Sequence, residues 1–214
     1  QQNAYIKTVE GMQEEVRRFR HDYRNMMSGL YLTAEEGELA EAGRFLQEMT
    51  EDFDSQIGGQ IRQMGQLSNV HITEVKGLLL AKLAQMQREG TACELEVMRP
   101  FQGTRCRTTD LCRCLGILID NAMEEVRGQE DARVHIMISS QEGYTTFRVK
   151  NRLYHSVDVH RIWQQGYSTK GADRGIGLAS YRKILEGYED VLPATAVQEG
   201  YFIQEFKVRE RNGK

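Results

Sequence analysis

Residues 115–125 read Leu115-Gly116-Ile117-Leu118-Ile119-Asp120-Asn121-Ala122-Met123-Glu124-Glu125, an apolar run that turns abruptly polar. The pattern predicts a helix that is capped by Thr108 or Thr109 and continues to Val126. Its polar end carries an amide followed by two carboxylates. The neighbouring sequence shows what kind of domain this helix belongs to.

Asn121, Glu124 and Glu125 share the polar end of the predicted helix. An amide oxygen presented from a helix can bind Mg²⁺, which prefers hard oxygen ligands and often binds together with nucleotide phosphates. A solvated helix end is the alternative interpretation. The stretch by itself does not decide between a metal site and a solvated surface.

The flanking sequence predicts an α/β sandwich with helices on one face of a mostly antiparallel sheet. Further helices are predicted at about 70–88 and 178–185, and strands at 94–98, 133–140, 144–150 and 201–209. Between the second and third of these strands, Glu142-Gly143 indicates a hairpin turn.

A glycine-rich loop, Gly166-Tyr167-Ser168-Thr169-Lys170-Gly171-Ala172-Asp173-Arg174-Gly175-Ile176-Gly177-Leu178, leads into the last predicted helix. Glycines let backbone amides approach phosphate oxygens, and the helix start and two basic side chains add positive charge. The alternative is a flexible surface loop with a glycine cap. The loop matches neither a Walker motif nor a dinucleotide fingerprint.

The N-terminal residues carry an uninterrupted apolar stripe in alternating steps of four and three. Its members are Tyr5, Val9, Met12, Val16, Phe19, Tyr23, Met26 and Leu30. The stripe predicts a helix over about 3–32, and a second stripe predicts another over 39–57. Because so narrow a hairpin cannot bury both stripes alone, we expect it to pair with a second copy as a four-helix bundle.

His21 lies on the face of the first helix that is furthest from this stripe, in the string Phe19-Arg20-His21-Asp22-Tyr23-Arg24-Asn25. With Phe19 at heptad position d, His21 falls at position f and faces solvent. An exposed imidazole beside the Asp22 carboxylate suits a nucleophile that acts on a group outside its own helix.

The bulk composition is that of an ordinary globular protein. The chain has 214 residues, is 40% hydrophobic and 28% charged, and its net charge of −3 gives no indication of nucleic-acid binding. Its four cysteines fit no metal-ligand spacing, so we expect reduced thiols. No apolar run reaches the roughly 20 residues of a membrane helix, and the start without Met suggests a fragment of a longer chain.

Three motifs together resemble AgrC-type sensor histidine kinases of the GHKL ATPase superfamily. Residues 19–25 are similar to the phosphoacceptor box of that family, 120–124 to its N box, and 168–178 to its G box. The resemblance implies an α+β chain, with a dimerising helical hairpin for histidine phosphotransfer at 1–60. A GHKL-type α/β sandwich that binds ATP follows at 61–214.

The resemblance also implies an activity, protein-histidine kinase, and its cofactors, ATP and Mg²⁺. In this reading Mg-ATP phosphorylates His21, Asp22 takes a proton from the imidazole, and Asn121 binds the metal. Asn25 either holds a water for regulator dephosphorylation or is a surface amide. The ATP contacts implied by the family are Asn121, Glu124, Glu125, Asn151, Ser168, Thr169, Lys170, Gly171, Arg174, Gly175, Gly177 and Leu178.

Partners follow from the same resemblance. The kinase would act as a homodimer and pass the phosphoryl group to an aspartate of a response regulator, which in this family commonly carries a LytTR domain. A membrane sensor region would precede Gln1. The chain would then be the cytoplasmic portion of an inner- or plasma-membrane protein.

Two residues depart from the wider superfamily. Asn151 stands where the adenine-reading Asp-x-Gly-x-Gly has its aspartate, and Ile117 stands where ATP-hydrolysing members keep a glutamate. An amide can still bond to adenine, and the missing base favours transfer to histidine over hydrolysis. Two alternatives stay open: a degenerate kinase that acts as a dimeric docking module, and a GHKL ATPase or serine kinase.

Overall fold

The computed structural model of the chain describes residues 59–159, 161–162 and 177–211. The chain divides into two compact units, 1–64 and 65–214, and most of the described residues belong to the second. The predicted helical hairpin over 3–57 lies outside the described residues, and so does the predicted glycine-rich loop up to 176.

The second unit contains a five-stranded mixed sheet with the strand order β1-β2-β3-β5-β4. Its strands are β1 (Ala92–Val97), β2 (Arg133–Gln141), β3 (Tyr144–Arg152), β4 (Val191–Gln198) and β5 (Tyr201–Arg209). β1 pairs with β2 in parallel, and the other neighbours pair antiparallel. The order puts β3 and β5, which are far apart in sequence, at the centre of the sheet.

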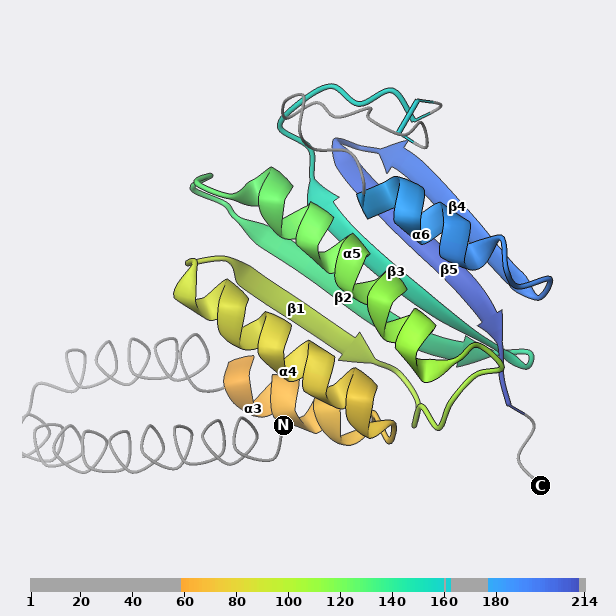
Figure 1. Cartoon of the computed structure of the whole chain (residues 1–214). Helices are drawn as coiled ribbons and strands as arrows, with labels where there is room; N and C mark the ends of the chain where they lie inside the picture. The colour runs from red at the N-terminus through yellow and green to blue at the C-terminus, as the bar shows by residue number, and fades with distance from the viewer. Residues whose placement is uncertain (1–58, 160, 163–176, 212–214) are drawn as a thin grey trace, which may run out of the picture. The chain divides into compact units, whose positions relative to one another are not determined.

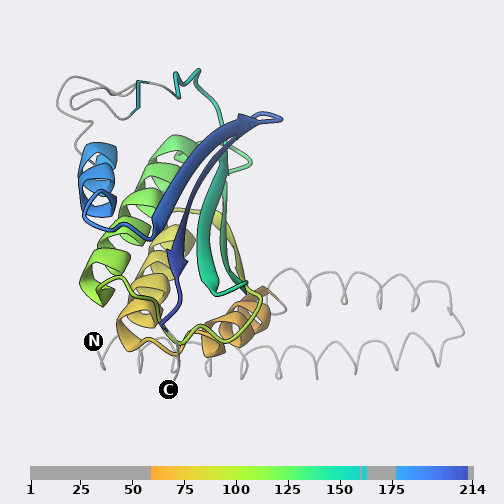
Figure 2. The ribbon, with the colours of Figure 1, turned by 90° about the vertical axis from the view of Figure 1, so that its right-hand side faces the viewer.

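Helices cover one face of this sheet (Figures 1 and 2). They are α4 (Thr73–Arg88), α5 (Thr108–Val126) and α6 (Gly177–Leu185), and α3 (Gly59–Ser68) precedes them in the chain. α5 lies between α4 and α6 and contacts both, and it also contacts β2 and β3. This two-layer arrangement is the predicted α/β sandwich.

Alternating side chains of the sheet form the core beneath α5. Val134, Ile136 and Ile138 of β2 are buried, and Phe147 of β3 stacks on Phe206 of β5 at a centroid distance of 5.0 Å. From α5 the core receives Leu111, Cys114, Leu115, Leu118, Ile119, Ala122, Met123 and Val126. The period of two in the strands and the apolar face of α5 therefore meet in one core.

Most predicted elements are confirmed, and two were missed. Residues 108–126 are helical as predicted, and Glu142-Gly143 turns with φ angles of 54° and 78°, as a tight hairpin requires. β4 was missed because it is an exposed edge strand that contains Pro193, which such a position tolerates. Its signal is Glu199-Gly200, which repeats the same dipeptide with φ angles of 51° and 78°. α3 was missed because Gly58 and Gly59 stand at its start, and Gly59 is its first residue.

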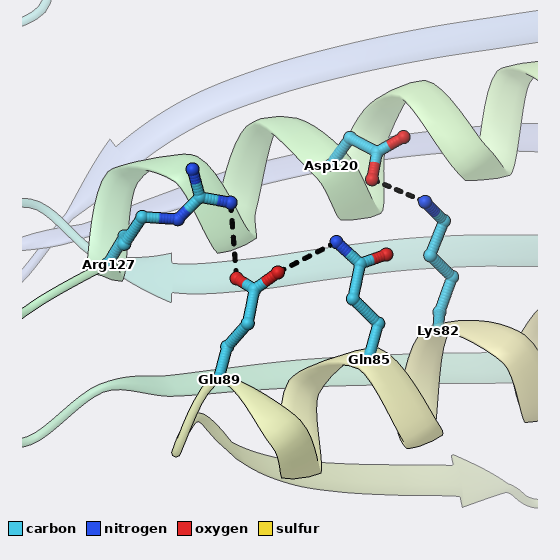
Figure 3. Close-up of polar contacts among 5 residues, drawn as sticks. All are labelled: Lys82, Gln85, Glu89, Asp120 and Arg127. Atoms are coloured by element: carbon cyan, nitrogen blue, oxygen red, sulfur yellow. Dashed lines mark hydrogen bonds and ion pairs between the residues drawn. The ribbon is translucent and has the colours of Figure 1, made fainter.

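Polar side-chain contacts join α4 to α5 (Figure 3). Lys82 pairs with Asp120, and Arg127 Nη2 lies 3.1 Å from a carboxylate oxygen of Glu89. The hydrogen bond from Gln85 and the Arg127 guanidinium lower the pKa of Glu89. Two ion pairs thus flank the stretch of α5 that carries Asn121.

The Lys82–Asp120 pair predicts an asymmetric response to mutation. The Lys82 side chain is only 16% exposed whereas that of Asp120 is 49% exposed, so Asp120→Ala leaves a half-buried ammonium unpaired and Lys82→Met leaves a carboxylate that water can reach. We expect Asp120→Ala to lower the free energy of unfolding by about 1–3 kcal/mol and Lys82→Met by less than about 1 kcal/mol. Urea denaturation followed by circular dichroism measures both.

The matched control is Asp190→Ala, which removes one partner of the exposed pair between Arg105 and Asp190. Exposed pairs contribute about 0–1 kcal/mol, so this variant should unfold close to wild type. Equal losses for Asp120→Ala and Asp190→Ala would show that Lys82 reaches solvent when its partner is removed.

Candidate functional site

Asn121 meets a buried glutamine of the sheet. It lies on the half-buried side of α5, and its Nδ2 donates a hydrogen bond of 3.1 Å to Oε1 of Gln204 in β5. Gln204 is only 2% exposed. Because Nδ2 is directed at the sheet, the Oδ1 atom of Asn121 is the end of the amide that is available to a ligand.

Two buried polar atoms near this contact lack hydrogen-bond partners among the described residues. They are Nε2 of Gln204 and Oγ1 of Thr195, which is the register partner of Gln204 on β4. Buried polar atoms in folded proteins are nearly always paired with protein or ordered water. Unpaired donors at this point mark a place where a polar ligand or a water can bind.

Asn151 lies on the same face of the sheet, at the end of β3. It is 3% exposed, and its Nδ2 donates to the carbonyl oxygen of Arg152 at 2.8 Å. Its register partner on β5 is Phe202, two residues before Gln204. The sheet therefore carries two buried amides on neighbouring rows beneath the helices.

Glu125 fixes the backbone that leaves β3. Its Oε1 accepts hydrogen bonds from the backbone N–H groups of Tyr154 and His155, at 3.0 and 3.2 Å, and Nδ1 of His155 lies 3.1 Å away. The residue is 8% exposed, whereas Glu124 is exposed. These contacts give Glu125 a structural role that the sequence did not indicate, and ATP contact by either glutamate stays a prediction.

The end of the glycine-rich loop returns to α5. α6 begins at Gly177, and a Cβ built on that glycine would lie 3.5 Å from Cγ2 of Ile117. Ile117 is one helical turn before Asn121. Leu178 is half-buried in the first turn of α6. The loop thus rejoins the described structure beside the turn of α5 that leads to Asn121.

The other predicted site residues lie outside the described residues. They are His21, Asp22 and Asn25 of the N-terminal helix and Ser168, Thr169, Lys170, Gly171, Arg174 and Gly175 of the loop.

The donor set around Asn121 fits Mg²⁺ bound together with phosphates. In the described part of the chain, no three His, Cys, Asp or Glu residues lie where they could hold a metal ion. Mg²⁺ usually takes one or two protein oxygens and completes its shell with water and phosphate oxygens. A single amide oxygen suits that mode of binding, in which no dedicated protein cage is needed.

The four cysteines are free thiols, as predicted. Burial raises the pKa of Cys93 and of Cys114 to about 12, so both stay protonated and unreactive near neutral pH. Among the helices that the structure describes, none is long and apolar enough to span a membrane.

Residues 107–209 match the GHKL domain family. The match runs from the residue before α5 to the last residue of β5, and so it includes Asn121, Asn151 and Gln204. A curated relative is the sensor histidine kinase DcuS of Escherichia coli K12, 25% identical over 144 residues, which are 65% of this chain and 26% of that protein. The chain thus spans about a quarter of the curated relatives it matches.

Solved structures share the fold. The catalytic domain of the histidine kinase ThkA superposes with a TM-score of 0.56 at 17% identity, over 64% of this chain and 90% of that one. Full-length ShkA in complex with AMPPNP gives 0.50 at 20% identity, over 62% of this chain and 29% of that one. The described unit therefore has the fold of a histidine kinase catalytic domain, and the AgrC-type subfamily stays a prediction.

The contacts of Glu125 predict how the segment after β3 is held. Glu125→Leu removes the charged acceptor, and hydrogen bonds to charged groups contribute about 1.5–3 kcal/mol. We expect amide exchange at Tyr154 and His155 to become about 10- to 100-fold faster. Hydrogen-exchange mass spectrometry or NMR on the full chain measures this, with Glu124→Leu as the neighbouring control. Unchanged protection in Glu125→Leu would mean that other contacts hold the segment.

Proposed function

We propose that the chain is the catalytic core of a two-component sensor histidine kinase. Mg-ATP bound in the second unit phosphorylates His21, and the phosphoryl group then passes to an aspartate of a response regulator. The observation that carries the proposal is the amide of Asn121, directed by Gln204 within a match to the GHKL domain. Histidine kinase relatives and structural neighbours support it.

Nucleotide binding would use both layers of the sandwich. Asn121 from α5 would offer Oδ1 to Mg²⁺, and the buried amide of Asn151 would bond to adenine in place of an aspartate. Ser168, Thr169, Lys170, Gly171, Arg174, Gly175, Gly177 and Leu178 would surround the phosphates. When bound, Mg²⁺ neutralises phosphate charge during transfer. ShkA, a structural neighbour, was solved with an ATP analogue, which supports a nucleotide in this fold.

His21 would act as the nucleophile. One imidazole nitrogen attacks the γ-phosphorus as the bond to the oxygen that bridges to the β-phosphate breaks, and ADP leaves. Asp22 takes the proton from the other ring nitrogen, which keeps the attacking nitrogen electron-rich. Asn25, one turn further, would orient a water for dephosphorylation of the regulator.

Ile117 favours transfer to histidine over ATP hydrolysis. A general base is needed to activate water, and this half-buried apolar side chain stands where hydrolysing enzymes of the superfamily hold a glutamate. A GHKL ATPase is therefore the weaker candidate. Asn151 in place of aspartate motivates the other alternative, a degenerate kinase that serves as a docking module.

The assembly proposed from the sequence is a homodimer through residues 1–60, with a membrane sensor region before Gln1. The regulator would be of the LytTR type, and the kinase core would be cytoplasmic. Sensor kinase relatives that are about four times longer than the matched part are consistent with additional regions.

Incubation with γ-labelled ATP tests the chemistry. We expect acid-labile, alkali-stable label on the wild-type chain and none on His21→Gln. The ATP affinity of His21→Gln should stay within about twofold of wild type, because the acceptor histidine and the proposed nucleotide site belong to separate units. His71→Gln, which replaces an exposed histidine, is the control and should label normally. Free phosphate would indicate an ATPase, acid-stable label a serine kinase, and no turnover a docking module.

The dimer is tested at the apolar stripe. Phe19→Glu would place a charge inside the proposed bundle at a cost of several kcal/mol, so the chain should sediment as a monomer. Arg17→Glu, on the outward face of the same predicted helix, should remain a dimer. A dimer in both variants would show that the stripe packs elsewhere.

A further inference from the structure

Gln204 is held firmly at the point where it meets Asn121. It lies between Phe202 and Phe206 in a buried row on β5 that continues to Val208. Its register partners are Val149 on β3 and Thr195 on β4. A side chain 2% exposed between two aromatic residues has little freedom to move. The sheet therefore sets where the Gln204 amide lies relative to α5.

The contact decides which end of the Asn121 amide is presented. In the observed orientation Nδ2 of Asn121 donates to Oε1 of Gln204, and Oδ1 is left for a cation. The reversed orientation would present an NH₂ group, which cannot bind a metal ion. It would arise if Gln204 turned over and donated its own Nε2 to Asn121. Metal binding by Asn121 thus depends on the orientation of Gln204.

Packing fixes the position of Gln204, but among the described residues no acceptor fixes which way its terminal amide points. Its Nε2 is buried and has no hydrogen-bond partner among the described residues. A buried donor without an acceptor is unfavourable by about 1–3 kcal/mol. An acceptor brought by a bound ligand would satisfy this donor. It would also fix Oε1 toward Asn121.

We propose that Gln204 is a positioning residue that couples nucleotide to metal binding. A nucleotide acceptor atom, reached directly or through one water, pairs with Nε2 of Gln204, whose Oε1 then holds Oδ1 of Asn121 toward Mg²⁺. The inference rests on the proposed function, in which Asn121 binds the metal. By linkage, each ligand then strengthens the other's binding by the same factor.

Calorimetry on the full chain measures the coupling between nucleotide and Mg²⁺ binding, as the ratio of the ATP affinity with Mg²⁺ to the ATP affinity with excess EDTA. Gln204→Met keeps the length of the side chain and removes both its donor and its acceptor, so we expect the ratio to fall about tenfold, toward that of Asn121→Ala. Gln204→Glu keeps an acceptor for Asn121 but lacks the donor that pairs with the nucleotide, so it should not recover the ratio. Gln198→Met makes the same change at an exposed position of β4 and should match wild type.

Thermal unfolding without nucleotide separates positioning from a structural role. Because Nε2 is unpaired, Gln204→Met should be as stable as wild type or more so, while its Mg²⁺ coupling is lost. A wild-type ratio in Gln204→Met, with a reduced one in Asn121→Ala, overturns this inference alone. A wild-type chain that binds no ATP overturns the proposed function and the inference with it.

A second measurement needs no folded variant. In wild-type chain labelled with ¹⁵N-glutamine, the Gln204 side-chain amide resonance should shift when ATP is added, and the Gln198 resonance should not. An unchanged Gln204 resonance in chain saturated with Mg-ATP would exclude the proposed pairing.

Discussion

Helix α5 packs its apolar side over β2 and β3 and has α4 and α6 on either flank, and the described structure is organised around this burial. Leu115, Leu118 and Ile119 are each fully buried. Full burial of one such side chain contributes about 1.5–3 kcal/mol. The rotation of the helix is therefore fixed by its core residues. Because Asn121 and Glu125 lie on the same rigid helix, its rotation also sets the directions in which their side chains leave it.

The buried face of the sheet beneath the helices also carries polar side chains, at positions where a hydrophobic core usually has apolar ones. Gln204 and Asn151 are both buried, and each lies on a strand whose other helix-facing residues are mainly apolar. Valine or leucine at position 204 would pack without an unpaired donor. Violations of local rules in an otherwise consistent fold are typical of functional sites. One of the unpaired buried atoms, Nε2 of Gln204, belongs to the side chain that contacts Asn121.

The parts of the site that the sequence predicted are those with a local signal. The apolar spacing of residues 108–126 predicts a helix, and Glu142-Gly143 predicts a turn through its glycine, which readily adopts positive φ. The missing parts depend on contacts between distant residues. Gln204 is 83 positions from Asn121, and Glu125 is 29 from Tyr154, the backbone it binds. No periodicity reports such pairs. β4 was not predicted for a different reason, since an exposed edge strand has no alternation of apolar residues.

The two missed contacts each constrain a different segment around the candidate site. Glu125 holds the backbone just after β3, three residues beyond Asn151, while Gln204 directs the amide of Asn121 from below. Preorganisation of this kind matters most for phosphoryl transfer, where catalysis depends on positioning and charge more than on covalent chemistry. A side chain that merely filled the space at 204 would leave the Asn121 amide to turn either way. A polar residue at position 204 thus orients the amide of Asn121, and this orientation replaces the apolar packing that a hydrophobic side chain would provide.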